Sequence, residues 1–410
     1  MKEKNEFHIG YKALIGAMIG AGCGLSSISF YTHSVFANAI SSDTGWSRGD
    51  VQLGVSIMIL MAIITAPLVG SLIDRFGARI IGLISVPLYS LSMSLFFFVD
   101  DNLASYYLAW AFMSILAAGT LPITWTKIVN TWFNRKRGLA LGLTLAGTGI
   151  AATFGPTYVS LLISEFGWRL SYLILSLTII IIAFPAVFFL FKDPGSGELA
   201  LFSDKNNNIN VNVNVSAAEA LLGYKFWVMG IALIFAAAGI SGLITSSVPI
   251  LVDKGLKLSE AAQYAGLIGL SVILGRLLVG VLLDYFWAPL VAAIFLAAPI
   301  FTSLIFSSHL ESGLAISLSM IILGLAAGAE LDLLAFLVSR YFGLLDYGKL
   351  YGGQYIFFSI GAGLAPAAFG KAFDIFGNYD LALNLVAITS IASGLLILTL
   401  GRYPEVRESY

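Results

Sequence analysis

Charged residues are scarce in this sequence. They make up 11% of its 410 residues, whereas a soluble domain carries about 25%. Hydrophobic residues make up 58%, and the mean hydropathy is +0.91. A chain with so few charges has no polar coat to face water, so we expect most of its surface to face lipid.

Cysteine and histidine are also scarce. Cys23 is the single cysteine, which excludes an internal disulfide. His8, His33 and His309 lie far apart, which excludes the helix-borne zinc motif with two histidines four residues apart. A Walker-type Gly-Lys-Ser/Thr loop is missing as well, which argues against ATP as the energy source. We therefore expect no catalytic residues, no metal, no cofactor and no nucleic-acid partner.

Long apolar stretches are abundant. A helix that crosses a bilayer needs roughly 20 mostly apolar residues, and twelve stretches meet this requirement. Proline and glycine inside several of them are tolerated in membrane helices. The predicted spans are about 11–39, 50–73, 80–99, 103–133, 138–163, 170–191, 225–252, 260–283, 288–307, 312–341, 350–373 and 380–401.

Basic residues predict the orientation. Twelve spans place both termini on one side, and fifteen Lys and Arg residues fall on that side against five on the other. Cytoplasmic loops carry the excess of basic residues. We predict a multi-pass protein of the plasma (inner) membrane with both termini in the cytoplasm.

The chain repeats itself at an offset of about 210 residues. Six spans precede the polar stretch 193–223, which we interpret as a cytoplasmic linker, and six follow it. We therefore predict an N-terminal bundle over 1–192 and a C-terminal bundle over 224–410. Matching pairs at this offset are Gly70 and Gly280, Asp74 and Asp284, Phe76 and Phe286, Gly142 and Gly352, Pro156 and Pro366, and Gly167 and Gly377.

Because each copy has an even number of spans, the copies run in the same direction through the membrane. The predicted fold is all-α, with two six-helix bundles related by a pseudo-twofold axis along the membrane normal. Transporters built from such parallel repeats bind substrate near mid-membrane, where the halves meet.

The junction of the second and third spans carries a family signature. It reads Gly70-Ser-Leu-Ile-Asp74-Arg75-Phe-Gly77-Ala-Arg79 and resembles the loop of the major facilitator superfamily. The second copy, from Gly280 to Asp284, is degraded. The resemblance implies the major facilitator fold and a role in gating. The gating residues it indicates are Gly70, Asp74, Arg75, Gly77, Arg79 and Asp284.

A narrower resemblance concerns the monocarboxylate and oxalate/formate branch. The run from Trp132 to Gly142, the glycine-rich fifth span and Arg276 are similar to that branch, which moves small organic anions, often with a proton. This sequence departs from it in two places. Val272 stands where monocarboxylate carriers place an aspartate, and the eleventh span lacks the lysine of oxalate/formate antiporters.

Four charged residues fall within spans, where an ionised side chain needs a partner, a wet cavity or a function. Arg276 lies roughly 12 Å from the cytoplasmic end of span eight. Its planar guanidinium fits a carboxylate, so it is our candidate substrate anchor; the alternative is a structural ion pair. Lys127 either contacts the same anion or extends to the interface.

Glu330 and Asp332 are the candidate proton-coupling residues. Two residues on a helix differ by about 200° of rotation, so the two carboxyls do not share a face. Either could pair with Arg276, and such a carboxyl can bind and release a proton as its surroundings change. A purely structural role is the alternative. Further candidates for substrate contact, or for simple packing, are Tyr31, His33, Trp125, Gln354 and Tyr355.

The glycine run from Gly16 to Gly24 follows no strand, so it predicts close helix packing rather than a dinucleotide loop.

The leading hypothesis is a monomeric, proton-linked transporter of a small carboxylate. A second hypothesis is export of drug-like compounds, or transport of an amine or zwitterion held by Glu330 or Asp332. A membrane receptor or an enzyme on a helical scaffold is the alternative outside transport.

Overall fold

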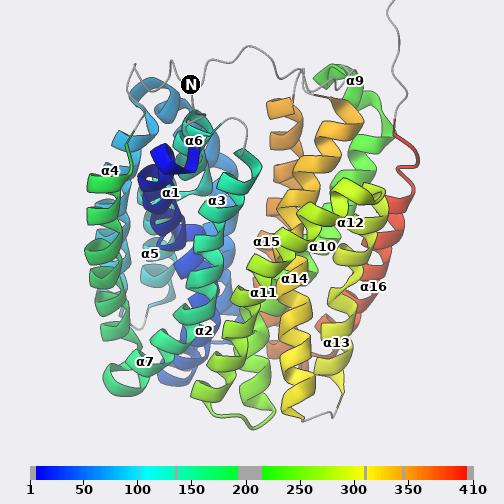
Figure 1. The fold of residues 1–410 in the computed structure, drawn as a ribbon. Helices are drawn as coiled ribbons and strands as arrows, with labels where there is room; N and C mark the ends of the chain where they lie inside the picture. Colours follow the sequence, from blue (N-terminus) through cyan, green and yellow to red (C-terminus); the bar gives the residue numbers. More distant parts are fainter. Residues whose placement is uncertain are drawn as a thin grey trace, which may run out of the picture. The chain divides into compact units, whose positions relative to one another are not determined.

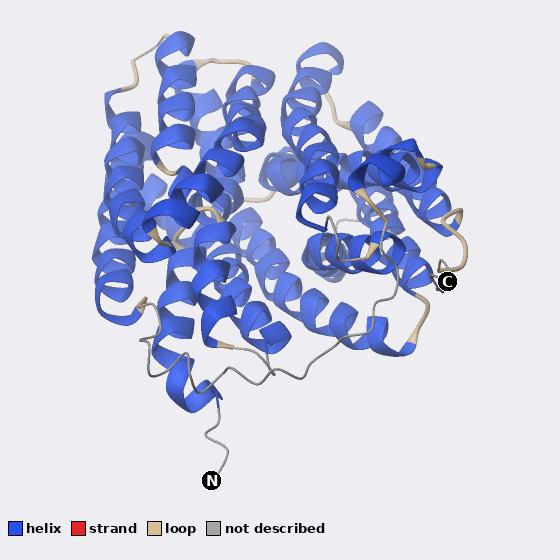
Figure 2. Ribbon diagram, turned by 90° about the horizontal axis from the view of Figure 1, so that it is seen from above, coloured by secondary structure: helices blue, strands red, loops and turns tan. Residues whose placement is uncertain are grey.

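The structure, a computed structural model, describes six stretches of the chain. They are residues 6–100, 102–133, 137–192, 215–308, 312–343 and 347–403, without the side chains of residues 6, 74, 130, 137, 138, 284, 347 and 348. The described residues form helices and loops, with no strand among them (Figure 2).

The chain divides into two compact units. Unit 1 comprises Met1–Asn206 and Ser247–Gly269, and unit 2 comprises Asn207–Ser246 and Leu270–Tyr410. The boundary therefore does not coincide with the boundary between the two sequence repeats. The segment 247–269, from the second repeat, belongs to unit 1.

Unit 1 is built from the helices of the first repeat (Figure 1). They are α1 (Glu6–Gly22), η1 (Leu25–Ser29, a π-helix), α2 (Phe30–Thr44), α3 (Arg48–Phe76), α4 (Ala78–Ser94), η2 (Leu95–Phe98), α5 (Leu103–Leu116), η3 (Ala118–Thr120), α6 (Pro122–Trp132) and α7 (Arg137–Leu190).

Unit 2 holds most of the second repeat. Its helices are α9 (Ala217–Leu222), α10 (Tyr224–Asp253), α11 (Leu258–Tyr285), α12 (Ala288–Ala297), α13 (Pro299–Ser307), α14 (Gly313–Phe342), α15 (Tyr347–Phe376) and α16 (Asp380–Leu398). The last residues of α10 and the first of α11 lie in unit 1.

Three predicted spans are interrupted rather than continuous. The first is broken between Gly22 and Leu25, where a Cβ atom on Gly24 would lie only 2.6 Å from the Thr120 carbonyl oxygen. The fourth is broken before Pro122, whose ring keeps Leu121 extended at ψ 155°. The ninth is divided between α12 and α13 at Pro299.

The glycine run of the first span packs closely against neighbouring elements, as predicted. A Cβ atom on Gly20 would lie 2.5 Å from the Trp125 ring, and one on Gly22 would lie 2.7 Å from the Gly147 carbonyl oxygen. These glycines let α1 approach α6 and α7 more closely than any side chain would allow.

Ten helical stretches in the described part of the chain are long and apolar enough to cross a membrane. One of them, Leu139–Leu190, covers two predicted spans, and Gly167 interrupts it with φ 73° and ψ 167°. The predicted fourth span corresponds to α5 and α6, each of which is shorter than a crossing.

The repeat has a counterpart in the helix boundaries. Helices α3, α4, α5 and α7 begin at positions 48, 78, 103 and 137, and α11, α12, α14 and α15 begin at positions 258, 288, 313 and 347. Each pair of starts is therefore separated by the offset of the sequence repeat. Gly45 and Gly255, which the same offset separates, both have positive φ, and so do Gly167 and Gly377. Glycines with positive φ therefore occur at corresponding positions of the two repeats.

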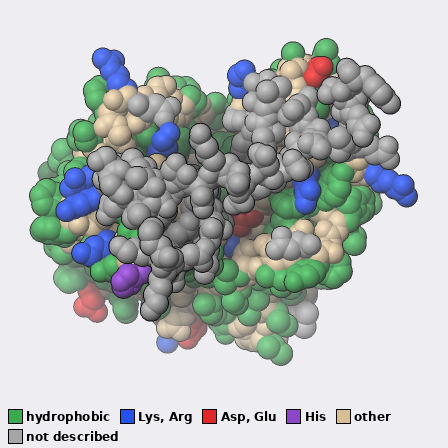
Figure 3. Space-filling view, turned by 45° about the horizontal axis from the view of Figure 1, so that its top comes forward, with side chains coloured by type: hydrophobic (Ala, Val, Ile, Leu, Met, Phe, Trp, Pro, Cys, Tyr) green, Lys and Arg blue, Asp and Glu red, His purple; other side chains and the backbone are tan. Residues whose placement is uncertain are grey.

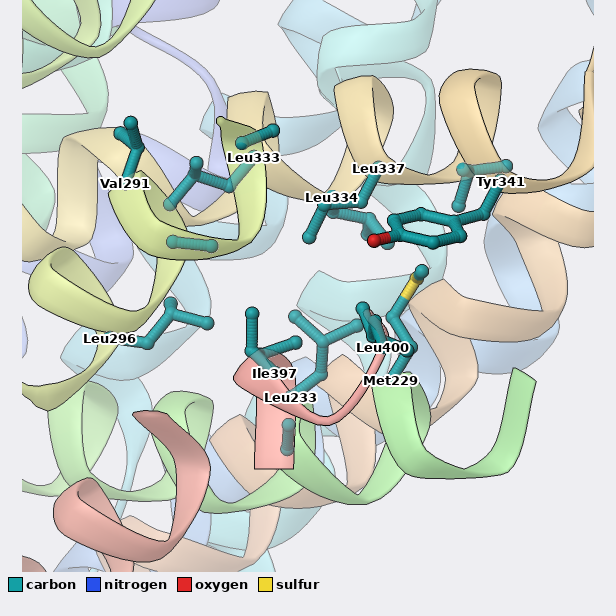
Figure 4. Close-up of a cluster of buried hydrophobic side chains, with 14 of the residues drawn as sticks. Met229, Leu233, Val291, Leu296, Leu333, Leu334, Leu337, Tyr341, Ile397 and Leu400 are labelled. Carbon is teal, nitrogen blue, oxygen red and sulfur yellow. The ribbon is translucent and has the colours of Figure 1, made fainter. Parts of the chain in front are cut away.

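The apolar core of unit 2 lies among α10, α12, α14 and the end of α16. Leu233, Val291, Leu334 and Ile397 are buried there together (Figure 4). Lipid is as apolar as leucine, so close packing and bonds between helices hold such a core together. One such bond runs from the Ser393 hydroxyl on α16 to the Ala232 carbonyl oxygen on α10, at 2.8 Å.

In Figure 3, apolar side chains cover much of the surface that is drawn in colour, and Lys and Arg side chains lie scattered among them. Exposed examples are Ile64 and Leu68 on α3, each 60% exposed. In water such a surface would be unstable, so it supports a surrounding of lipid.

The predicted linker 193–223 lies outside the described residues as far as position 214. Its final part contains α9, which begins with a capping box between Ser216 and Glu219. This local capping pattern stabilises a short helical turn at the end of the segment, and its role as a cytoplasmic linker stays a prediction.

Candidate functional site

Two glycines fix α11 against α14 in unit 2. A Cβ atom on Gly275 would lie 2.5 Å from the Leu325 carbonyl oxygen, and one on Gly328 would lie 2.2 Å from that of Val272. Both contacts lie where α11 and α14, which run in the same direction (Figure 1), cross one another. Only glycine permits such close contact between backbones.

This packing brings Arg276 and Asp332 together. Arg276 directly follows Gly275 on α11, and Asp332 lies one turn beyond Gly328 on α14, so both side chains lie next to this crossing. The Arg276 Nη1 atom lies 3.7 Å from the Asp332 Oδ1 atom. This distance is that of an ion pair without a good hydrogen bond.

The guanidinium of Arg276 is poorly satisfied. Its side chain is 12% exposed, and its Nε and Nη1 atoms have no hydrogen-bond partner among the described residues. A buried charge normally has hydrogen bonds as well as an opposite charge, because water no longer solvates it. Arg276 therefore has capacity for a further acceptor, such as a carboxylate.

Glu330 and Asp332 occupy different surroundings, as the rotation of about 200° between them predicts. The Asp332 side chain is 37% exposed, whereas Glu330 as a whole is 4% exposed. Glu330 interacts electrostatically with Tyr355 on α15, and its Oε1 atom has no hydrogen-bond partner among the described residues. Asp332 is thus the carboxyl that meets Arg276, and Glu330 is the enclosed one.

Gln354 and Tyr355 lie side by side in sequence on α15 but differ in setting. Gln354 is fully buried, and its Nε2 atom donates to the Phe226 carbonyl oxygen at 2.7 Å. Its Oε1 atom has no partner in the described part of the chain. Tyr355 is half-buried, with its ring 5.2 Å from that of Phe358. Of the two, Tyr355 is associated with Glu330.

Two candidates in unit 1 are packing residues in this structure. Trp125 is fully buried; it donates to the Thr120 carbonyl oxygen at 2.9 Å, and its ring lies 5.1 Å from that of Phe191. His33 is fully buried between Gln52, at 3.1 Å, and the Trp110 ring. The contacts of Trp125 and His33 satisfy the packing alternative. Their contact with substrate stays a prediction.

The remaining unit 1 candidates are more accessible. Lys127 is exposed on α6, and Tyr31 is half-buried on α2 with its ring 5.2 Å from that of Phe30. The structure brings neither of them to a described site together with another candidate. Their roles stay predictions.

The gating signature forms the turn between α3 and α4. Gly77 supplies the positive φ of 85° that this turn requires. Arg79 donates to the Phe188 carbonyl oxygen on α7 at 3.2 Å, and the Arg75 guanidinium lies 5.2 Å from the Phe76 ring centre. The side chains of Asp74 and Asp284 lie outside the described residues.

Gly70, the first residue of the signature, has an open setting, because a Cβ atom there would meet only Ile123 among the described residues, at an ordinary 3.6 Å. Its role in gating stays a prediction.

The sequence analysis did not predict two ion pairs, because the two residues of each pair lie far apart in the chain. Arg48 pairs with Asp253, with Nη1–Oδ2 at 2.6 Å and Nη2–Oδ1 at 2.7 Å. Arg169 pairs with Asp43 at 2.7 Å. Each arginine had been recognised only as a basic residue outside the spans, and no local pattern indicates its partner.

Among the described residues, no group of three or more His, Cys, Asp or Glu side chains is arranged to hold a metal.

The profile of the Major Facilitator Superfamily matches residues 19–366 of this chain. The chain belongs to that superfamily, and it is a multi-pass membrane transporter rather than an enzyme. The all-helical structure and its apolar surface agree with this assignment.

Relatives in several organisms share part of the sequence. An MFS-type transporter of Gibberella moniliformis is 29% identical over 44% of this chain and 43% of its own length, so the chain spans less than half of that protein. The uncharacterized MFS-type transporter YhjX of Escherichia coli is 24% identical over 82% of both chains. The oxalate:formate antiporter of Oxalobacter formigenes is 28% identical over 55% of this chain and 52% of its own length. The chain is thus similar to the oxalate/formate branch.

Proposed function

We propose that this protein carries a small organic anion, a mono- or dicarboxylate, across the membrane by alternating access coupled to protons. The observation that supports it best is the state of Arg276. Its guanidinium is largely buried, and one carboxylate lies near it at the long distance of 3.7 Å. A substrate carboxylate would supply the two parallel hydrogen bonds that the fork lacks.

The proposal places twelve crossings in two six-helix bundles, with both termini in the cytoplasm of a monomer in the plasma membrane. The non-helical backbone of Gly167 inside α7 supports two crossings in that long apolar stretch, and we propose that α5 and α6 together make another. The common offset of the helix starts supports a pseudo-twofold relation along the membrane normal.

For proton coupling, we assign Glu330 as the first choice and Asp332 as the second. Glu330 is enclosed and has an oxygen without a hydrogen-bond partner among the described residues, so we propose that it takes up and releases a proton as the site changes shape. Asp332 competes with the substrate carboxylate for Arg276. When the substrate binds Arg276, Asp332 loses its positive partner, which favours the binding of a proton by Asp332.

The second candidate function is transport of an amine or zwitterion, or export of a cationic drug-like compound. The half-exposed carboxyl of Asp332 favours it, because this carboxyl could hold a cationic group. The first function predicts an anionic ligand at Arg276, whereas the second predicts a cationic group at Asp332. The substrate test below therefore separates them.

The test is counterflow in proteoliposomes preloaded with oxalate or formate. Labelled carboxylate should accumulate transiently in liposomes that contain the protein. Arg276→Lys should slow this exchange by at least about tenfold, because a lysine cannot form the bidentate bond.

Arg402→Lys is the matched control, since Arg402 is exposed near the C-terminus and should keep the full rate. If no mono- or dicarboxylate exchanges or inhibits, the anion proposal is wrong, and exchange of amines should be measured next. Full exchange by Arg276→Lys would make Arg276 a structural residue.

A further inference from the structure

Two aspartates occupy matching positions of the two repeats but pair with different arginines. Asp43 lies near the end of α2 and Asp253 is the last residue of α10, so the offset of 210 residues separates them. Asp43 pairs with Arg169 of its own repeat at 2.7 Å. The position of the second repeat that matches Arg169 is occupied by Tyr379, which has no positive charge. Asp253 pairs instead with Arg48, which belongs to the first repeat.

The two ion pairs therefore join different parts of the chain. Asp43 accepts a second hydrogen bond from the Trp168 indole at 2.8 Å, so its contacts hold residues of the first repeat to one another. The Arg48 guanidinium meets both oxygens of Asp253, at 2.6 and 2.7 Å, and so joins the start of α3 to the end of α10. The Arg48–Asp253 pair thus connects the two repeats, whereas the Asp43–Arg169 pair does not.

A second contact between the repeats lies along α11. A Cβ atom on Gly266 would lie 2.5 Å from the Thr153 carbonyl oxygen of α7, and one on Gly269 would lie closer still to the Thr153 backbone nitrogen. All three residues belong to unit 1. Backbones this close leave no space for a solute between α7 and α11 at this level. Arg276 follows Gly269 by seven residues, or about two turns, so the two residues share a face of α11.

We propose that Arg48 and Asp253 form a releasable latch that joins the outer ends of the two repeats and, with the α7–α11 contact, closes the outer route to Arg276. This inference rests on alternating access and on the orientation in the proposed function. Opening toward the outside then requires the pair to separate and the segment 247–269 to leave unit 1. The side chains of Arg48 and Asp253 are 20% and 34% exposed, so water can solvate both charges after separation. Such a pair is weak enough to break in every transport cycle.

Distances between spin labels test the latch. Because Cys23 is the single cysteine, a Cys23→Ala background allows labels at two added cysteines, Ser42→Cys on α2 and Lys257→Cys before α11. Both positions are exposed. In full-length protein in nanodiscs, Asp253→Asn and Arg48→Gln should each raise the ratio of separated to closed molecules about two- to fivefold, since each removes one partner of the pair.

Reversing the pair separates a latch from a general effect of charge. The double variant Arg48→Asp with Asp253→Arg restores opposite charges at the same two positions and should return the ratio toward that of the unaltered pair. Asp43→Asn is the matched control, because it breaks the ion pair at the matching position of the first repeat. It should leave the distance distribution unchanged.

An unchanged ratio in Asp253→Asn and Arg48→Gln would overturn the inference, and so would an equal rise in Asp43→Asn. If one of the charge variants does not fold, Gly269→Ala provides an independent test with both charges in place. It should raise the same ratio by forcing α11 from α7, and an unchanged ratio would also reject the inference.

Failure of the proposed function has a different signature, namely no carboxylate counterflow by the unaltered protein. Separation that depends on the pair but comes without counterflow would support the latch and reject carboxylate transport. Counterflow with no separation in any variant would support transport and reject the latch.

Discussion

At the scale of single residues, three arginines of this protein differ in the distance to their carboxylate partner. Arg48 and Arg169 hold their carboxylates at 2.6 and 2.7 Å, whereas Arg276 lies 3.7 Å from Asp332. Short pairs near the surface contribute at most about 1 kcal/mol each to stability. The long and largely buried pair leaves hydrogen-bonding capacity unused, which is why we assign binding to Arg276.

The uncharged Val272 lies one turn before Arg276 on α11, so this position supplies no carboxylate partner for Arg276. Monocarboxylate carriers are expected to place an aspartate here, one turn from the arginine, whereas the carbonyl of Val272 receives Gly328 of α14. The carboxylate partner of Arg276 comes instead from Asp332 on that same helix. Asp332 and Arg276 thus lie on two different helices. Movement of α11 against α14 would therefore change the distance between the carboxylate and the guanidinium.

Glu330→Gln tests proton coupling. Removing the enclosed acid should abolish accumulation driven by a pH gradient, because no proton would accompany the substrate, and it should spare exchange at equal pH. Uptake into proteoliposomes with and without an imposed gradient measures both rates.

Asp380→Asn is the control for this change, because Asp380 is an exposed acid in the first turn of α16. Full gradient-driven accumulation by Glu330→Gln would remove Glu330 from the coupling mechanism. If Asp332→Asn behaved in the same way, neither carboxyl would be the proton site.

At the scale of helices, glycine contacts decide which residues meet. The contacts of Gly275 and Gly328 fix the register of α11 on α14, and with it the approach of Arg276 to Asp332. Both contacts involve carbonyl oxygens of the facing backbone, which cannot turn aside as a side chain can. An added methyl group must therefore separate the helices.

Gly328→Ala and Gly275→Ala should each destabilise the protein by about 1–3 kcal/mol through overpacking. The thermal unfolding midpoint in detergent measures this loss. Gly280→Ala on α11 is the control, because a Cβ atom there meets nothing within 4 Å. It should leave the midpoint unchanged or raise it, since alanine favours helix. Equal midpoints for all three variants would show that the α11–α14 contact is looser than described.

At the scale of the whole molecule, the basic residues predict the orientation. Fifteen Lys and Arg residues on one side against five on the other predict that both termini lie in the cytoplasm. Alkaline phosphatase, which is active only outside the cytoplasm, should be inactive when fused after Tyr410. Inserted between Lys254 and Lys257, in the loop after α10, it should be active. The reverse pattern would contradict the proposed topology and the cytoplasmic place of the gating loop.

The sequence by itself determined the class of protein. Hydropathy is an average over neighbouring residues, so the apolar stretches could be recognised without coordinates. The repeat and the superfamily signature are patterns of residue identity, so they could be recognised in the same way. The rotation of about 200° between Glu330 and Asp332 likewise predicted that they would differ in surroundings. The offset between matching landmarks of the two repeats reappears in the starts of four pairs of helices.

Only the tertiary structure decided which distant side chains meet. Whether Asp332 or Glu330 reaches Arg276 depends on the register of α11 against α14, which backbone contacts at two glycines set. The Arg48–Asp253 pair joins residues 205 positions apart, and Trp125 proved to pack against Gly20 and Phe191. Such contacts depend on the distance and rotation between elements, quantities that no local pattern of residues contains.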